Sequence, residues 1–208
     1  YLRKKRLAVI GIAIATMAIA CASLGMGTIA LSPADILSVI VGTADAQTTA
    51  VIVNMRLPRI LTALVAGIAL SLSGCAFQSV LRNPLASAST LGVAQGAAFG
   101  ASVAIILIAD SGAAAFEGAT SSVNPVMTAA CAFAGAMLST AVILGLSRLR
   151  EMTPESIVLA GVALSALFTA GTTLIQYFAE DSQVAAVVFW TFGDLSRVNW
   201  SQLAVMAA

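Results

Sequence analysis

Two arginines, Arg56 and Arg59, flank a Leu–Pro pair and are the side chains of this sequence best suited to charged recognition. The pattern around Pro58 predicts that a helix begins here, where the helix dipole is already positive and would favour an acid. Arginines in such a place either extend to lipid phosphates or receive carboxylates of an external partner as charge-assisted pairs. The second interpretation makes Arg56 and Arg59 candidate docking residues.

Other chemistry is limited by the residue types that the sequence omits. It contains no histidine, so Ser-His and Cys-His pairs and histidine-based metal or haem ligation are excluded. The three cysteines, Cys21, Cys75 and Cys131, lie in apolar stretches and form no CxxC pair. An odd number in such places predicts small packing residues rather than a disulfide framework or a metal site.

The overall composition indicates whether this protein is surrounded by water or by lipid. Of 208 residues, 60% are hydrophobic and only 9% are charged, with a formal net charge of +1. Ordinary globular domains carry roughly 25% charged residues. So few charges cannot cover a water-soluble particle, and they provide no field for nucleic-acid phosphates. The composition excludes a soluble enzyme, a disordered tail and a nucleic-acid binder, and predicts a protein embedded mainly in lipid.

The positions of the charges divide the chain into uncharged intervals. A lipid core about 30 Å thick is crossed by roughly 20 apolar helical residues, and each complete interval is long enough. We therefore predict an all-α polytopic transmembrane bundle that forms a single domain over 1–208. It has five complete spans and the start of a sixth, near 8–30, 59–80, 92–109, 126–147, 156–178 and from about 200 onward.

Prolines support these helix boundaries. Ser32-Pro33, Asn83-Pro84, Asn124-Pro125 and Thr153-Pro154 each combine a capping side chain with proline, which is typical of a helix start. Asp35 also suits a helix N-terminus. We predict a short interfacial helix near 33–41 that stops at Gly42, and a cap by Asn83 on the third span.

Lys and Arg counts predict the orientation. With the N-terminus in the cytoplasm, seven basic residues lie inside and three lie outside. The inside group is Arg3, Lys4, Lys5, Arg6, Arg82, Arg148 and Arg150, and the outside group is Arg56, Arg59 and Arg197. The alternative of a cleaved signal peptide is disfavoured, because the first apolar run is longer than the 7–15 residues usual for one.

The small residues indicate how the helices pack, and the positions of the acids indicate which energy source a transporter of this kind could use. Gly92, Gly96 and Gly100 form a GxxxGxxxG row that allows close helix packing. All acids lie at the edges of the spans or in loops, whereas ion-coupled carriers usually keep ionisable groups within the membrane. No phosphate-binding GxxxxGK[ST] loop is present. A transporter of this kind would take its energy from another polypeptide; an ion-coupled secondary transporter and an intramembrane enzyme are the weaker alternatives.

Several motifs together resemble the permease subunits of FecCD-type ABC importers, which take up iron-siderophores, haem and cobalamin. The matching positions are spread along the chain in the family's order. They are Arg56-Leu57-Pro58-Arg59, Gly67, Ser73-Gly74, Gln78, Arg82-Asn83-Pro84-Leu85-Ala86, Leu91-Gly92, Gly96-Ala97, Leu159–Leu164, Phe189-Trp190, Gly193, Leu195 and Trp200.

The resemblance implies a permease of about ten spans in a prokaryotic inner membrane, of which this chain resembles the N-terminal portion. Its expected partners are a second permease copy, two ATPase subunits that use ATP and Mg, and a periplasmic or lipid-anchored binding protein. No cofactor is expected on this chain. The expected cargo is a ferric siderophore, with haem, cobalamin or molybdate as alternatives. Arg56 and Arg59 match the arginines that meet acidic residues of the binding protein.

The resemblance also suggests a translocation path along the fifth span. Its candidate lining residues are uncharged and mostly hydroxylated: Ser165, Thr169, Thr172, Thr173 and Gln176. Such walls suit a bulky chelate that must pass without binding tightly. Alternatively, these hydroxyls bond their own helix backbone or a neighbouring helix.

Overall fold

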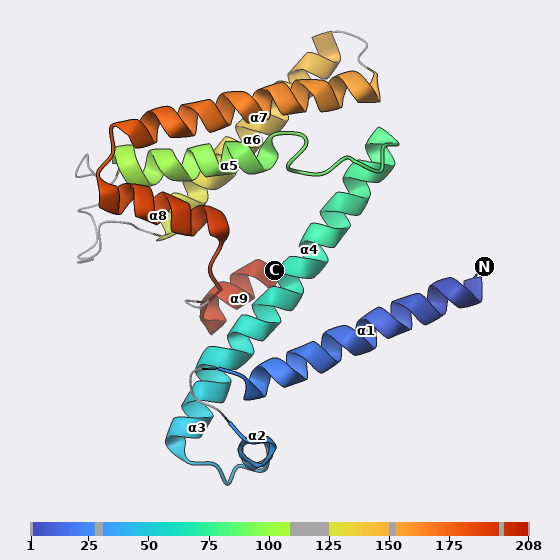
Figure 1. The fold of residues 1–208 in the computed structure, drawn as a ribbon, viewed down its shortest axis with the longest axis vertical. Helices are drawn as coiled ribbons and strands as arrows, with labels where there is room; N and C mark the ends of the chain where they lie inside the picture. Colours follow the sequence, from blue (N-terminus) through green and yellow to red (C-terminus); the bar gives the residue numbers. More distant parts are fainter. Residues whose placement is uncertain (1, 28–30, 109–124, 150–152, 196–197, 208) are drawn as a thin grey trace. The chain divides into compact units, whose positions relative to one another are not determined.

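The computed structural model describes residues 2–27, 31–108, 125–149, 153–195 and 198–207, and every regular element among them is a helix (Figure 1). This agrees with the predicted all-α fold. The described chain divides into two compact units, residues 1–69 with 195–208 and residues 70–194. The single domain predicted over 1–208 stays a prediction.

The first unit contains the elements near both ends of the sequence. They are α1 (Leu2–Gly25), α2 (Pro33–Val41), α3 (Ala46–Ala50), the π-helix η1 (Val51–Arg56), the first part of α4 (Leu57–Leu81) and α9 (Trp200–Ala207). The start of α9 agrees with the helix predicted from about 200.

Helix α2 has the bounds that its caps dictate. The Ser32 hydroxyl accepts from the backbone N–H of Asp35, and the Asp35 carboxylate accepts from the backbone N–H of Ser32. This is a capping box, with Pro33 at the start. Gly42 ends the helix in the left-handed conformation, at φ 80°. The interfacial position of α2 remains a prediction.

The helix that carries the two arginines begins much earlier than predicted. Helices α3, η1 and α4 run without a break over Ala46–Leu81. Its N-cap is Asp45, and a hydrogen bond from the Thr48 side chain lowers the pKa of Asp45 below its ordinary value. The predicted start near residue 59 is therefore wrong. The dipole argument for Arg56 and Arg59 is wrong as well, because both lie inside the helix.

A π turn explains how proline fits inside this helix. An interior proline has no N–H to donate, and its ring clashes with the preceding turn of an α-helix. Here the preceding residues, Val51–Arg56, widen into η1, in which the N–H of Leu57 donates to the carbonyl of Ile52 five residues back. The wider turn accommodates Pro58, whose side chain is fully buried. The sequence predicted a helix start at Pro58, whereas in the structure the helix continues through this position with a π turn before it.

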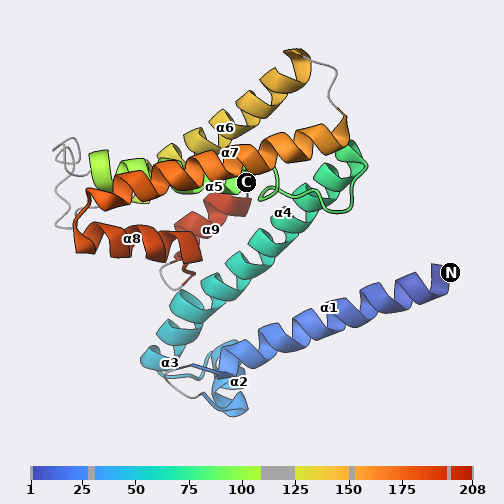
Figure 2. The same cartoon turned by 45° about the horizontal axis from the view of Figure 1, so that its top comes forward.

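The second unit is built from the remaining helices (Figure 2). They are the later part of α4, α5 (Val93–Ser102), η2 (Val103–Ile108), α6 (Pro125–Leu149), α7 (Pro154–Tyr177) and α8 (Asp181–Phe192). Helix α7 begins as predicted, since the Thr153 hydroxyl accepts from the N–H of Ser156. Helix α8 was not predicted; a reciprocal cap between Glu180 and Gln183 starts it.

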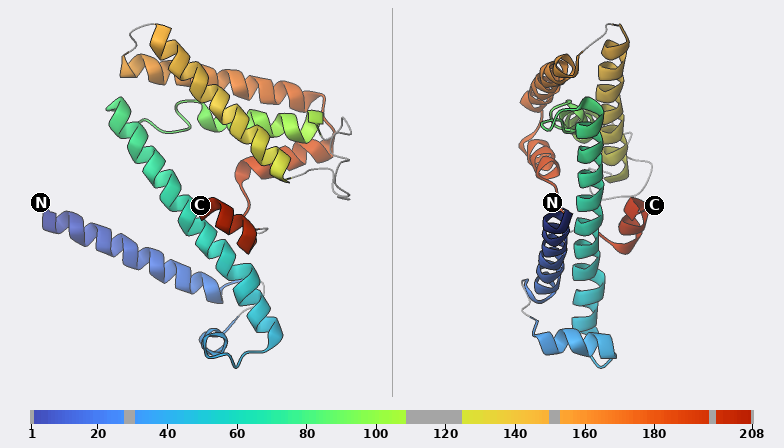
Figure 3. Two further views of the ribbon diagram at one scale, coloured as in Figure 1. Left: turned by 180° about the vertical axis from the view of Figure 1, so that it is seen from behind. Right: turned by 90° about the vertical axis from the view of Figure 1, so that its right-hand side faces the viewer.

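Glycines set the packing in this unit, where α5 and α6 cross side by side (Figure 3). A Cβ on Gly96 would lie 2.6 Å from the carbonyl oxygen of Gly135, and one on Gly100 would overlap the backbone at Cys131. The glycine row predicted on the third span thus allows contact between two backbones. Gly92 differs from the prediction, because it is the N-cap of α5, at φ 76°, rather than a helical position.

Four of the helices are long and apolar enough to cross a membrane. They are Arg3–Gly25, Ala46–Leu81, Pro125–Arg148 and Pro154–Tyr177. The span predicted at 92–109 corresponds to the shorter apolar helix Val93–Ile108. Residues 109–124, which follow it, lie outside the described part of the chain.

Candidate functional site

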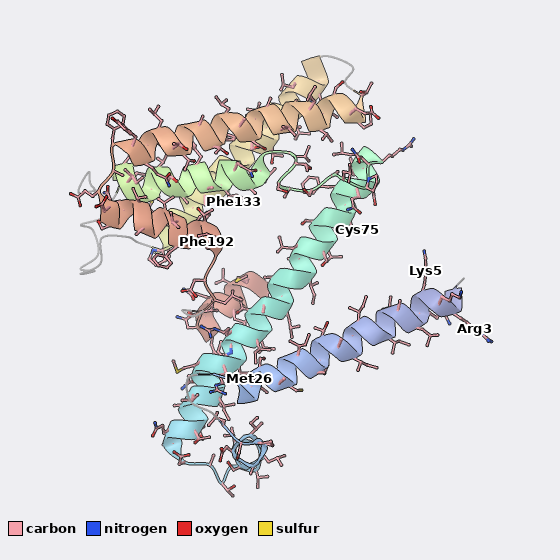
Figure 4. The ribbon with its side chains drawn as sticks, in the orientation of Figure 1. Arg3, Lys5, Met26, Cys75, Phe133 and Phe192 are labelled. Carbon is pink, nitrogen blue, oxygen red and sulfur yellow. The ribbon has the colours of Figure 1, made fainter. Side chains whose placement is uncertain are left out.

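Arg56 joins two helices of the first unit. Its side chain is half-buried, and Nη1 donates to the carbonyl of Leu24 in the last turn of α1. The last carbonyls of a helix have no partner within it and carry partial negative charge. Met26, labelled in Figure 4, follows directly after this end of α1. Arg56 therefore caps α1, which sequence reasoning did not foresee.

Arg59 lies three positions later and contacts a different part of the chain. Its side chain is exposed, and Nε donates to the carbonyl of Leu195 at 3.4 Å. A guanidinium has five N–H donors. This bond therefore leaves the terminal nitrogens of Arg59 able to receive a carboxylate, and the docking interpretation is compatible with the geometry.

Trp200 gives the first unit another link to the helix of the arginines. The indole Nε1 donates to the carbonyl of Val53 within the π turn, at 3.1 Å. Sequence comparison with the family had marked Trp200 only as a signature residue. Nothing in the spacing of the sequence pairs residues 147 positions apart, so this contact could not have been predicted.

The motif residues after α4 form a compact turn in the second unit. Arg82 adopts the left-handed conformation, at φ 47°, and the N–H of Asn83 donates to the carbonyl of Gln78. The Gln78 amide donates to the carbonyl of Pro84 at 3.0 Å. The Asn83 side chain accepts from the N–H of Leu85 at 2.9 Å. Asn83 therefore closes the end of α4, and the predicted cap on the third span is wrong because α5 begins only at Val93.

The segment that leads into α5 is attached to α6 and α7. The Ser139 hydroxyl donates to the carbonyl of Leu91, and the Ser165 hydroxyl lies within bonding distance of the carbonyls of Ser89 and Gly161. A Cβ on Gly92 would lie 3.2 Å from the Gly161 carbonyl, so this N-cap requires glycine for space as well as for its positive φ. The contacts hold the loop 87–92 against two membrane-length helices.

The candidate path residues share one side of α7, since they recur at spacings of three and four residues. Thr169 and Thr173 are exposed and donate their hydroxyl protons to the carbonyls four residues back in their own helix. Thr172 and Gln176 are half-buried. The interpretation that hydroxyls bond the helix backbone is thus confirmed for Thr169 and Thr173, and for Ser165 as one of two acceptors.

A shallow groove runs along this exposed side of α7. Its volume is about 690 Å³. Its lining residues are Ala166, Thr169, Ala170, Thr173, Leu174 and Tyr177. Because the two threonines use their protons internally, they present methyl groups and oxygen acceptors without fixed charge. Among the described residues, no cluster of cysteines or acids could hold a metal ion.

The glycines of α4 behave differently from those of α5. A Cβ on Gly67 or Gly74 would meet no described atom within 4 Å beyond the helix's own backbone. At neither motif position is glycine required for space. Their role, unlike that of Gly96, stays a prediction.

Ser139 is a residue that sequence reasoning missed. Its side chain is fully buried at the contact between α6 and Leu91. A signal was present, because Cys131, Gly135 and Ser139 form a row of small residues at spacings of four that faces the glycines of α5.

These features define a polytopic α-helical membrane protein with close glycine-mediated packing. The chain belongs to the FecCD transport family, whose model matches residues 5–208. A Methanocaldococcus jannaschii protein named as an ABC transporter permease is 47% identical over 186 residues, covering 89% of this chain and 53% of its own length. The Fe(3+)-citrate import system permease YfmE of Bacillus subtilis is 30% identical, covering 99% and 57%.

A solved structure shares the fold. It is described as an inward-facing conformation of a metal-chelate type ABC transporter, with a TM-score of 0.75 and 29% identity. The match covers 96% of this chain and 57% of that one. The chain thus spans about half the length of the relatives it matches.

Proposed function

We propose that this chain is part of the permease subunit of an ABC importer that moves an iron-siderophore-type metal chelate into the cytoplasm. The family match over residues 5–208 is the observation that carries this proposal. Haem, cobalamin and molybdate are the alternative cargoes, and the chemistry of the described residues favours none of them over another.

The side of α7 that bears Thr169 and Thr173 supports a translocation path. Its exposed groove has no charged lining residue, so a chelate could pass without a strong electrostatic trap. A path between two such faces would require a second permease copy, in a homodimer or a heterodimer. Within this proposal Ser165 holds the loop 87–92, and the path is lined mainly by its more exposed neighbours.

The proposed partners would provide the energy for transport and deliver the chelate. Two ATPase subunits that use ATP and Mg would bind on the cytoplasmic side and provide the energy. A periplasmic or lipid-anchored binding protein would deliver the chelate and dock through acidic residues on Arg56 and Arg59. The exposed guanidinium of Arg59 supports this docking more directly than that of Arg56. The proposed location is a prokaryotic inner membrane with the N-terminus in the cytoplasm.

Uptake by proteoliposomes tests the cargo and the energy source together. The full-length permease, its cognate ATPase and its cognate binding protein would be reconstituted and offered a labelled ferric siderophore, haem, cobalamin or molybdate. We expect accumulation of the ferric siderophore only with ATP inside the vesicles. Accumulation driven by an ion gradient alone would contradict the proposal, and ATP-driven uptake of another cargo would correct the substrate.

A charge reversal tests the docking surface in the same preparation. Changing both arginines, R56E with R59E, should weaken binding of the binding protein at least tenfold, because attraction at two sites becomes repulsion. The matched control, R56K with R59K, keeps both charges and should retain most of the affinity. Unchanged affinity in the reversed variant would reject the docking role.

A further inference from the structure

The π turn in front of Pro58 leaves a defined backbone acceptor. In η1 the N–H of Leu57 donates to the carbonyl of Ile52, five residues back. The next bond in this pattern would join the N–H of residue 58 to the carbonyl of Val53. Residue 58 is proline and has no N–H. The carbonyl of Val53 therefore lacks its partner within the helix.

Trp200 supplies a donor to that same carbonyl. The indole Nε1 lies 3.1 Å from the Val53 oxygen. The bond is exposed and Val53 is half-buried, so the indole supplies the partner at the surface of the helix, beside the buried side chain of Pro58. An indole N–H can only donate, which matches it to an orphaned carbonyl.

A reciprocal cap at the start of α9 holds Trp200 in place. The Asn199 side chain accepts from the N–H of Gln202 at 3.0 Å, and the Gln202 side chain accepts from the N–H of Asn199 at 3.2 Å. This reciprocal cap fixes the first turn of α9, in which Trp200 is the first residue.

The π turn also affects the contact between Arg56 and α1. A π turn contains one more residue than an α turn, so it rotates the residues before it by about 100° relative to those after it. Arg56 lies inside the wide turn and Arg59 lies beyond it. Because Arg56 is the last residue of this turn, loss of the wide turn would rotate the part of the chain that precedes it and so would separate the Leu24 carbonyl of α1 from Arg56.

We propose that Trp200 is a positioning residue for Arg56: its indole N–H replaces the backbone N–H that Pro58 lacks and so stabilises the π turn that keeps Arg56 in contact with the end of α1. The proposal rests on the proposed docking function, because it assigns the position of one docking residue, Arg56, to a bond from α9.

A double-mutant cycle between Trp200 and Pro58 tests this inference. W200F removes the N–H and keeps an aromatic ring, and P58A restores a backbone donor. The full-length permease in lipid nanodiscs would be titrated with its cognate binding protein. With Pro58 in place, W200F should weaken docking about three- to fivefold, as expected for the loss of an exposed hydrogen bond to an acceptor that has no partner within the helix. When P58A is also present, the same change should weaken docking by less than about 1.5-fold, because the Val53 carbonyl then has a backbone donor.

The control is W190F, which removes the other indole N–H, located in α8 of the second unit, and should leave the affinity unchanged. Equal weakening by W200F with and without P58A, or no weakening in either case, would overturn the inference. The thermal unfolding midpoint of the same variants without the binding protein gives a second readout, with the same non-additivity expected. If R56E with R59E leaves docking unchanged, the proposed docking role fails, and the unfolding cycle decides whether the Trp200 bond replaces the Pro58 donor.

Discussion

Arg56 and Arg59 are close in the sequence but bind parts of the chain that are far apart. Arg56 donates to Leu24 in α1, whereas Arg59 donates to Leu195, 136 positions later. Each arginine therefore has a structural task besides the proposed docking. An effect of mutation on uptake must be separated from an effect on stability.

Alanine substitutions should distinguish the two arginines. We expect R56A to lower the free energy of unfolding by about 1–2 kcal/mol, because it removes a charged donor from the carbonyl end of α1. R59A should lower it by less than about 0.5 kcal/mol, because its bond is long and exposed. Unfolding in detergent by titration with a denaturing surfactant measures both. Equal losses would contradict the assignment of Arg56 as the cap of α1.

The prolines show which local features can be predicted from the sequence and which cannot. Pro33 and Pro154 follow capping side chains, and both helices begin there, because a cap depends on three or four adjacent residues. Pro58 follows Leu57, which cannot cap, and lies inside a helix. Its accommodation depends on a wide turn and on Trp200, and contacts at such separation leave no local pattern.

At the scale of elements, the contact between α5 and α6 depends on the absence of side chains. Gly96 and Gly100 face Cys131 and Gly135 so closely that a Cβ would overlap backbone atoms. The sequence showed the row on α5 but could not name its partner. It also gave no signal for α8, whose 12 residues are too short to register as a membrane span.

Two glycines of α6 allow a matched test of this packing. G135A should destabilise the protein by about 1–3 kcal/mol, because the added methyl group would overlap the backbone of α5. G145A adds the same atom to the same helix, where no described side chain or other helix lies within 4 Å. Alanine is the better helix former, so G145A should be neutral or stabilising by up to about 1 kcal/mol. Thermal unfolding in detergent compares the pair, and equal effects would mean that the contact with α5 is not tight.

At the scale of the whole molecule, the orientation rests on the distribution of Lys and Arg. The four membrane-length helices fix where the chain can cross the lipid but not its direction. Single cysteines placed after Cys21, Cys75 and Cys131 are replaced by alanine determine the direction. L85C, in the exposed turn after α4, should react with a membrane-impermeant thiol reagent only from the cytoplasmic side. T43C, between α2 and α3, should react only from outside; the reverse pattern would invert the layout.

The bond between Trp200 and Val53 has a consequence for biosynthesis. A ribosome adds about 5–20 residues per second, so the donor emerges roughly 7–30 s after its acceptor, 147 positions earlier. During that interval the nascent helix carries an unpaired carbonyl beside its only proline. Nascent chains that stop before residue 200 should therefore be degraded faster by membrane quality-control proteases than chains that include Trp200.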